Sequence, residues 1–330
     1  GIIGTLIVCG LLYIGVAVVL TGIAHDRESH VAYESSINQF AMDEKDGYFR
    51  IATTKNRSWS EFFNDDKSLS QSYNNMYVLE PSLRVVGRLE GLAKGERIYS
   101  VRFMGDRAYM VTFEQIDPLF VFDMKDPKAP KVMGELKIPG FSNYLHPYDE
   151  NTLIGLGKET VDNGSGGVTT RGVKLSLFDV TDISSPRQID TYELGDKGSD
   201  SIALYDHKAF LFSGSKKLLV IPVTLNEQKA GESYPSFVFG GAAVFNVDKI
   251  NGFTLKGKID HSDGSQANSR ENWWHYPYYD NTVKRSLYIN DTIYTFSSRY
   301  MQMHKLEDAS FINKVELQKP QIFIEDDVII

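Results

Sequence analysis

The sequence predicts an all-β protein of about five four-stranded sheets arranged as a β-propeller, preceded by one apolar helix. Three observations support this prediction. Residues 2–24 carry no charged side chain. After about residue 36, short alternating runs of β-branched and aromatic residues are separated by Asn, Asp and Gly. A strand-and-turn unit then recurs at a spacing of roughly 45 to 65 residues, which is typical of propeller blades.

Composition excludes several classes of protein. The chain has 330 residues, of which 42% are hydrophobic and 24% charged, and this balance excludes wholesale disorder and a polytopic membrane protein. The formal net charge of -8 argues against a nucleic-acid partner, because few basic groups are available to displace phosphate counterions. The single cysteine, Cys9, excludes a disulfide framework and any Cys-based metal site.

The apolar segment at residues 2–24 predicts a transmembrane helix. At about 1.5 Å per residue it would span about 35 Å, which is enough for the hydrocarbon core of a bilayer. A buried core helix is the alternative, although such helices rarely run this far without a polar face. A cleavable signal peptide is less favoured, because no basic residue precedes the apolar run. The charges that flank the segment do not set its orientation.

The strands and their turns follow from local sequence chemistry. Residues 48–53, 108–113 and 292–296 alternate as half-buried strands do. Residues rich in Asn, Asp and Gly mark tight turns between strands, because these residues tolerate a positive φ. Such turns are expected at 45–47, 104–106, 206–207 and 290–291.

One repeated string shows that the sheets are copies of one unit. Residues 120–127 and 176–182 share Phe-Asp and a second Asp three residues further on. Each is followed by a Pro and a basic residue, at 130–131 and 186–187. Degenerate copies lie near residues 76, 244 and 303. A β-sandwich, the alternative fold, would not explain this repeat. A single sheet cannot bury both of its faces, so neighbouring units must stack around an axis. The expected units are 36–91, 95–139, 142–195, 199–261 and 283–317.

These strings also resemble a known family. The chain is similar to the secreted β-propeller domain family of archaea and bacteria, which is distantly related to WD-repeat proteins. The resemblance covers about residues 36–317 and is carried by NQFAMDEKDGYFRIATT (38–54), FVFDMKDPKAPK (120–131), SLFDVTDISSPR (176–187) and VKRSLYINDTIYTFSS (283–298). It implies an extracytoplasmic or membrane-anchored propeller. Family members have more sequence before the first of these strings, where this chain has the apolar segment instead.

The remaining parts of the chain complete the expected organisation. Residues 1–24 form the transmembrane helix, 25–35 a linker, 36–317 the propeller and 318–330 a C-terminal tail. The string at 1–24 also resembles one transmembrane helix of bacterial amino-acid permeases, which would indicate a gene fusion or an artefact. A weaker likeness is to the apolar N-terminus of archaeal pilins.

The loop between the fourth and fifth units is the candidate ligand site. Rigid aromatic side chains lose little entropy on binding, so their density on a loop suits stacking on sugar rings or anchoring a peptide. The alternatives are a structural plug over the blade ends and a catalytic role for Glu271 or His275. The candidate ligand-binding residues are Arg270, Glu271, Trp273, Trp274, His275, Tyr276, Tyr278 and Tyr279.

No catalytic or metal-binding motif is recognisable, so catalytic residues cannot be named from the sequence. We expect no metal and no other cofactor. Calcium is the alternative, because the acidic turns at 43–47 and 123–126 offer the carboxylate oxygens that hard cations prefer.

Two classes of function follow. The first is a membrane-anchored binding or scaffold module on the extracytoplasmic side of the cell membrane, which recognises a surface protein or a glycan and is not an enzyme. The second is a polysaccharide-acting enzyme that uses the propeller channel, an analogy from fold alone. A truncated or fused fragment without independent function is a third possibility.

Overall fold

The computed structural model describes residues 34–56, 71–113, 117–165, 167–229, 231, 234–262 and 282–317. Within these ranges, the regular structure is strands and short 3₁₀ helices. No helix in this part of the chain is long and apolar enough to cross a membrane. The predicted transmembrane segment 2–24, most of the linker and the tail 318–330 lie outside the described residues.

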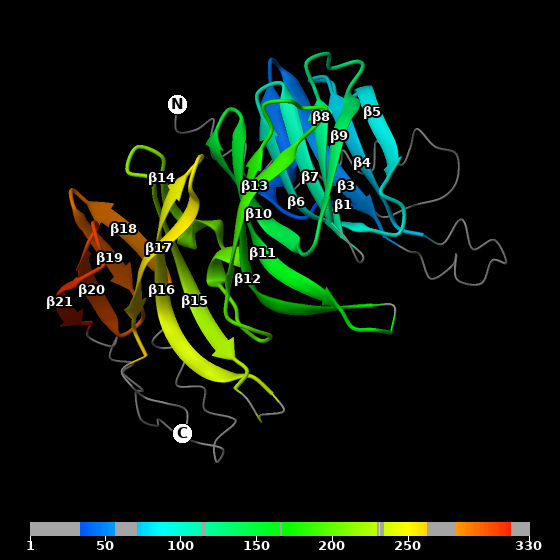
Figure 1. The fold of residues 1–330 in the computed structure, drawn as a ribbon. Helices are drawn as coiled ribbons and strands as arrows, with labels where there is room; N and C mark the ends of the chain where they lie inside the picture. The colour runs from blue at the N-terminus through cyan, green and yellow to red at the C-terminus, as the bar shows by residue number, and fades with distance from the viewer. Residues whose placement is uncertain are drawn as a thin grey trace, which may run out of the picture. The chain divides into compact units, whose positions relative to one another are not determined.

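The described strands form five antiparallel sheets, which confirms the predicted all-β architecture (Figure 1). The first contains β1 (Glu34–Ser35), β2 (Met42–Lys45), β3 (Tyr48–Lys55), β4 (Tyr73–Leu79) and β5 (Val85–Leu92). The second contains β6 (Arg97–Met104), β7 (Arg107–Phe113), β8 (Asp117–Asp123) and β9 (Lys131–Ile138). The third contains β10 (Phe141–Asp149), β11 (Thr152–Asp162), β12 (Val168–Asp179) and β13 (Arg187–Leu194). The fourth contains β14 (Leu211–Ser213), β15 (Leu218–Glu227), β16 (Ser236–Asp248) and β17 (Gly252–Asp260). The fifth contains β18 (Arg285–Ile289), β19 (Thr292–Phe296), β20 (Tyr300–Lys305) and β21 (Phe311–Glu316).

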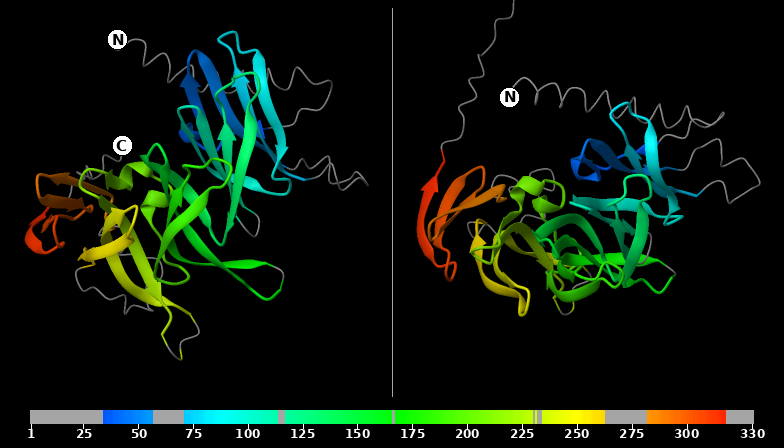
Figure 2. Two further views of the ribbon diagram at one scale, coloured as in Figure 1. Left: turned by 45° about the horizontal axis from the view of Figure 1, so that its top comes forward. Right: turned by 90° about the horizontal axis from the view of Figure 1, so that it is seen from above.

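Strands follow one another in chain order across the second to fifth sheets, and the first sheet has the order β1-β3-β4-β5 with β2 also paired to β3. The graded colours of each sheet in Figure 2 follow this order. The repeated string of the sequence falls on the third strand and the turn after it, at β8 and β12.

The chain divides into two compact units, each of which is described by itself. Unit 1 is Gly1–Thr169 with Leu177–Gln188, and unit 2 is Thr170–Ser176 with Ile189–Ile330.

The first strand is continuous in the second, third and fifth sheets but broken in the first and fourth. In the first sheet, β1 and β2 pair with opposite ends of β3, and the 3₁₀ helix η1 (Gln39–Ala41) lies between them. In the fourth sheet, Asp200 bridges to Thr224 before β14 pairs with β15. The 3₁₀ helices η3 (Ile202–Leu204) and η4 (His207–Ala209) fill the gap.

One predicted turn is wrong for this reason. Asp206-His207 does not join two strands. Asp206 instead caps η4, and its carboxylate accepts a hydrogen bond from the Lys208 backbone N–H at 3.0 Å. Asp is favoured at the position before a helix and also in tight turns. The same residue type therefore predicted the wrong element. The other predicted turns have a positive φ where expected, at Asp46, Gly105 and Asn290.

Neighbouring sheets are joined by a repeated contact, which we call the turn-on-strand joint. In it, the turn after the third strand of one sheet lies against the backbone of the fourth strand of the sheet before it. A Cβ atom added at Gly134 of β9 would lie 2.5 Å from the Ile183 carbonyl oxygen and 2.8 Å from Pro186 Cδ. Gly87 of β5 meets the Pro127 carbonyl oxygen and Pro130 in the same way. At Gly257 of β17 an added Cβ would lie 2.9 Å from the Ala309 Cβ of the turn in the fifth sheet. Only glycine allows so close an approach of two backbones.

The joint explains why the repeated turn carries two aspartates and a proline. The Asp123 carboxylate accepts a hydrogen bond from the Lys125 N–H, and Asp126 accepts one from the Lys128 N–H, each at 2.9 Å. Asp179 and Asp182 do the same in the third sheet. These Asx turns fix the shape of the segment that lies on the preceding sheet. Ordinary turn chemistry therefore accounts for the acidic residues that suggested calcium.

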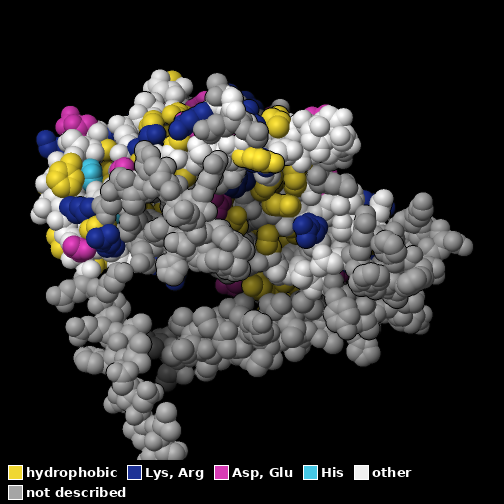
Figure 3. Space-filling view, turned by 90° about the horizontal axis from the view of Figure 1, so that it is seen from below, with side chains coloured by type: hydrophobic (Ala, Val, Ile, Leu, Met, Phe, Trp, Pro, Cys, Tyr) yellow, Lys and Arg dark blue, Asp and Glu magenta, His cyan; other side chains and the backbone are white. Residues whose placement is uncertain are grey.

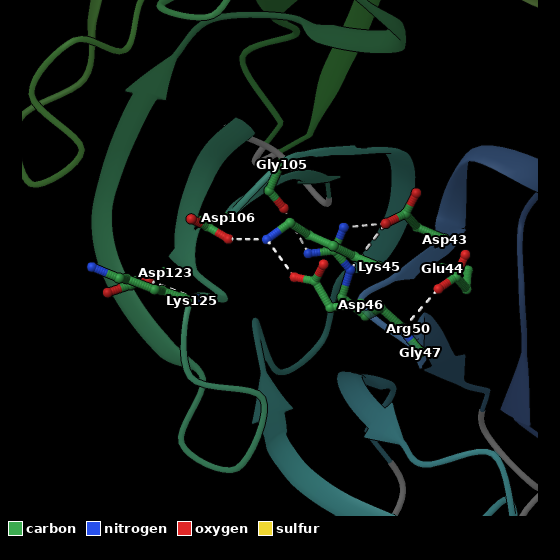
Figure 4. A network of polar contacts seen from close by, with 10 residues as sticks. All are labelled: Asp43, Glu44, Lys45, Asp46, Gly47, Arg50, Gly105, Asp106, Asp123 and Lys125. Carbon is green, nitrogen blue, oxygen red and sulfur yellow. Dashed lines mark hydrogen bonds and ion pairs between the residues drawn. The ribbon is translucent and has the colours of Figure 1, made fainter.

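Charged side chains add a second link between the first two sheets (Figure 4). Arg50 of β3 is only 4% exposed. Its guanidinium donates to the Asp43 carboxylate and, at 2.8 Å, to the Gly105 carbonyl oxygen in the turn of the second sheet. Lys45 pairs with Asp106 of that turn and, at 3.0 Å, with Asp46. The hairpin turns of the fourth and fifth sheets are linked likewise by Lys216 and Asp291, 3.2 Å apart.

The joint predicts a large difference between two glycine substitutions. We expect Gly134→Ala to lower the free energy of unfolding by about 2–3 kcal/mol, because the methyl group would overlap backbone that cannot move freely. Gly240→Ala is the matched control, since its Cβ would meet only the Phe237 ring, at 3.3 Å. Urea unfolding of both variants measures the difference. Equal stability of the two variants would contradict the joint.

Candidate functional site

The ligand-binding residues predicted from the sequence lie in the loop at 263–281, outside the described residues. The structure therefore does not test the predicted role of Arg270, Glu271, Trp273, Trp274, His275, Tyr276, Tyr278 and Tyr279. The ends of the loop, Ser262 and Thr282, are described. Thr282 lines a pocket, so the structure links that end of the loop to a cavity.

This cavity, the fourth-sheet pocket, lies where the first strand of the fourth sheet is broken. It has a volume of about 500 Å³, within the range of small-molecule sites. Asp200, Ser201 and Ile202 come from the break, and Thr224 and Asn226 from β15 beside it. The full lining is Gly198, Asp200, Ser201, Ile202, Tyr205, Thr224, Asn226, Phe237, Thr282 and Lys284.

The fourth-sheet pocket combines an aromatic ring with unused polar groups. Tyr205 is 73% exposed. Partial burial and the adjacent Asp200 carboxylate raise the pKa of its hydroxyl. The side chains of Thr224 and Asn226 form no hydrogen bond to another described residue. Lys284 donates to the Ser298 hydroxyl at 2.6 Å. The pocket thus offers a ring face, hydrogen-bond donors and acceptors, and one charge of each sign.

A second cavity, the first-sheet pocket, lies at the other broken strand. It has a volume of about 380 Å³ and is lined by Ser35, Ile37, Thr54, Asn56, Arg97, Ile98, Tyr99 and Asn143. The Asn143 side-chain oxygen is buried and has no hydrogen-bond partner among the described residues. Both pockets therefore arise from the same feature, because a broken first strand leaves space beside the second strand of its sheet.

A third group of interest, the Arg102 group, lies on the first strands of the second and third sheets. The Arg102 guanidinium stacks on the Phe40 ring of η1, 4.0 Å from its centroid, and Nε donates to the Leu145 carbonyl oxygen at 2.9 Å. The Tyr144 hydroxyl lies 3.0 Å from His146 Nδ1 on β10. Burial, and then the Arg102 charge, lowers the pKa of His146 to about 4. Burial also raises the pKa of Tyr144 and lowers that of Arg102.

Metal binding finds no additional support in the described part of the chain. It contains no group of three or more His, Cys, Asp or Glu side chains placed to hold an ion. The acidic turns proposed for calcium have other partners. Asp43 binds Arg50, and Asp46 and Asp106 bind Lys45. The Glu44 carboxylate accepts from the Gly47 N–H at 2.9 Å.

Sequence reasoning missed both pockets and the Arg102 group. The pockets depend on where a first strand breaks, and the only local signals are the caps Asn38, Ser201 and Asp206. The Arg102 group joins residues that are more than 100 positions apart, from Phe40 to His146. No spacing rule could bring them together.

Comparison with known proteins decides the family. The family model described as "Beta propeller domain" matches residues 35–309. The chain belongs to this family. The five antiparallel sheets are thus blades, as the repeated turn predicted. Neither the relation to WD-repeat proteins nor secretion is shown by this match.

Two archaeal relatives of this propeller are similar in sequence. An uncharacterized protein of Methanocaldococcus jannaschii is 38% identical over 284 residues, which is 86% of this chain and 37% of that protein. An uncharacterized protein of Archaeoglobus fulgidus is 43% identical over 190 residues, which is 58% of this chain and 26% of that protein. The propeller chain therefore spans well under half the length of these curated relatives.

A solved structure is also similar. The match is to apo AztD from Citrobacter koseri, with a TM-score of 0.45 and 12% sequence identity. It covers 84% of this chain and 59% of that one.

The buried imidazole predicts a pH dependence of stability. The pKa of His146 is about 4 in the folded propeller and about 6.5 in an unfolded chain. As the pH falls from about 6.5 to about 4, the unfolded state takes up a proton that the folded state does not, so stability falls over this window. The loss is at most about 3.5 kcal/mol over about 2.5 pH units, because each pH unit is worth about 1.4 kcal/mol per proton.

Urea unfolding between pH 4 and 7 measures this effect, and His146→Gln should reduce the slope in that window. Ring nitrogen shifts measured by NMR give the pKa directly. A His146 pKa near its ordinary value would contradict the placement of the side chain.

Proposed function

We propose that the propeller is a binding module and that it takes a carbohydrate at the fourth-sheet pocket. The observation that carries the proposal is the composition of this pocket. An exposed Tyr205 ring lies beside an amide and a hydroxyl, those of Asn226 and Thr224, that have no partner among the described residues. Thr282, at the end of the aromatic loop, lines the same cavity.

Sugar rings fit this composition. A pyranose presents a face of C–H groups that stacks on an aromatic ring and a rim of hydroxyl groups that both donate and accept hydrogen bonds. Asn226, Thr224 and Asp200 provide acceptors, and Asn226, Thr224 and Lys284 provide donors. The aromatic residues Trp273, Trp274, Tyr276, Tyr278 and Tyr279, with His275, Arg270 and Glu271, would extend the site from the loop.

Binding without catalysis is favoured by the acidic groups of the pocket. Glycoside hydrolysis needs two carboxyl groups about 5 to 10 Å apart. Asp200 is the only carboxylate in the described lining of the fourth-sheet pocket, and it lies beside Tyr205. A polysaccharide-acting enzyme would have to draw a second carboxylate from the loop, where Glu271 is the candidate.

The location of the protein is part of the same proposal. Residues 2–24 would anchor the propeller in the cell membrane on its extracytoplasmic side, where surface glycans and proteins are within reach.

No nucleic-acid partner is proposed, on the basis of the net charge of -8. On the face drawn in Figure 3, basic side chains are scattered among acidic, apolar and other ones.

Two exposed tyrosines allow a matched test of the pocket. Tyr205 is 73% exposed and lines the pocket, whereas Tyr234 is 81% exposed and does not. The wild-type propeller is screened on an array of archaeal and bacterial surface glycans, and the best oligosaccharide is then titrated by calorimetry. We expect Tyr205→Ala to weaken binding at least tenfold, because it removes the ring on which the sugar would stack. Tyr234→Ala should leave binding unchanged.

Further variants separate the loop from the pocket. Trp273→Ala with Trp274→Ala should also weaken binding while the unfolding transition stays cooperative. Retained affinity in this double variant would remove the loop from the site. Equal effects of the two tyrosine substitutions would remove the pocket. Cleavage of the oligosaccharide by the wild type, abolished in Glu271→Gln, would replace binding by catalysis.

Membrane anchoring is tested separately. We expect the full chain, expressed in an archaeal or bacterial host, to sediment with membranes and to resist extraction by high salt. Deletion of residues 2–24 should release the propeller. External protease should digest the propeller in whole cells. Recovery of the full chain in the soluble fraction would refute the anchor but not the pocket.

A further inference from the structure

Two arginines of unit 1 have similar surroundings but differ in one respect. Arg50 and Arg102 each lie over a phenylalanine ring, at 5.0 Å from Phe103 and 4.0 Å from Phe40. Each donates one hydrogen bond to a backbone carbonyl oxygen, at 2.8 Å and 2.9 Å. Arg50 also binds the Asp43 carboxylate. Arg102 has no carboxylate partner among the described residues.

This difference matters because Arg102 is only partly exposed. A guanidinium that is removed from water loses favourable hydration energy. Stacking on aromatic rings restores only part of this energy when no anion is bound. The burial is strong enough to lower its pKa, which is the direction expected when no anion compensates. The Arg50 side chain, which is buried more deeply, has such compensation from Asp43.

The unused hydrogen-bonding capacity of Arg102 has a defined geometry. The guanidinium presents five N–H donors in one plane. Nε donates to the Leu145 carbonyl oxygen, and the Tyr144 hydroxyl oxygen is a second acceptor beside the group. The remaining donors have no carboxylate acceptor among the described residues. The Phe40 ring covers one face of the planar guanidinium. The centroid of the Tyr144 ring lies 5.4 Å from the guanidinium carbon, Cζ. The two terminal NH₂ groups form the fork that fits two oxygens of a carboxylate or phosphate. The Tyr144 hydroxyl oxygen accepts from the guanidinium, and the same hydroxyl lies 3.0 Å from His146 Nδ1.

We propose that Arg102 binds an oxyanion at the first strands of the second and third sheets. The ligand class is a small molecule or group that carries a phosphate or a carboxylate. All of the residues that form this site belong to unit 1, and none of them lines the fourth-sheet pocket. The site is thus independent of the carbohydrate proposal, and failure of one does not affect the other.

His146 gives the site an internal reporter. The positive charge of Arg102 helps to lower the pKa of His146, after burial. Tyr144 of the same strand contacts His146, and η1 contributes the uncharged Phe40. An anion on Arg102 would cancel its charge, so the pKa of His146 should rise when the anion binds.

The alternative is that Arg102 only links the two sheets through stacking and the Leu145 carbonyl. A binding experiment separates the two roles. The wild-type propeller, Arg102→Met, Arg102→Lys and the control Arg88→Met are unfolded by heat at pH 7 in increasing sodium phosphate or sodium acetate, with sodium chloride keeping the ionic strength constant. Arg88 is exposed on β5, so its variant makes the same change of charge away from the site.

We expect a saturable rise in Tm with one of the two anions for the wild type and for Arg88→Met. Arg102→Met should show no saturable rise, and Arg102→Lys should bind at least tenfold more weakly because it lacks the fork. The anion that saturates identifies the group. The same rise in Arg102→Met, or no saturable rise in the wild type with either anion, would overturn the site.

The second measurement uses only the wild type, so it decides the matter even if Arg102→Met does not fold. The ring nitrogens of His146 are followed by NMR through a pH titration with and without the saturating anion. We expect the pKa of His146 to rise by one pH unit or more in its presence. An unchanged pKa at anion concentrations that saturate Tm would place the anion elsewhere.

Discussion

The turn-on-strand joint is the contact on which the arrangement of neighbouring sheets depends. At Gly87 and Gly134 the backbone of a turn lies where a side chain would otherwise stand, and at Gly257 the Ala309 Cβ of the turn does so. These glycines pair with Val78, Val121 and Val244, beside a bulge in each ladder. The bulge and the missing side chain together bend the fourth strand and open its backbone to the next sheet. The same valines are fully buried, so one register fixes both the core and the joint.

The fourth strand of each of the first four sheets is thus tightly specified by the joint, whereas the first strand varies from sheet to sheet. Two of the five first strands are broken by 3₁₀ helices, and both described pockets lie at those breaks. A break costs ladder hydrogen bonds, which side chains such as Asn38 and Ser201 replace only in part by capping. Loss of regular structure at these positions, with the rest of the fold preserved, is typical of functional sites.

Much of the fold could be predicted because its signals are local. Alternation within strands, the Asx turns at Asp123 and Asp179, and the repeat of that turn indicated five sheets with nearly the correct limits. The function of a given Asp was harder to predict, as Asp206 shows, because a cap and a turn use the same side-chain hydrogen bond. The loop at 263–281 was chosen from its composition alone. Arg102 could not be found in this way, since its stacking on Phe40 and its missing carboxylate are properties of three elements brought together by folding.

The third sheet shows that the joint is defined by space and not by a residue type. Its fourth strand carries Asp190 where the first, second and fourth sheets carry glycine. The Asp190 carboxylate accepts a hydrogen bond from the Phe253 N–H of the fourth sheet at 2.8 Å. The glycine now stands in the opposing turn, as Gly252, whose φ of 69° and close approach to Asp190 leave no room for a side chain. The joint therefore needs a glycine either on the fourth strand or in the turn that faces it. A search for a glycine on the fourth strand alone would therefore miss the joint between the third and fourth sheets. A search for a glycine on either of the two facing segments finds all four joints.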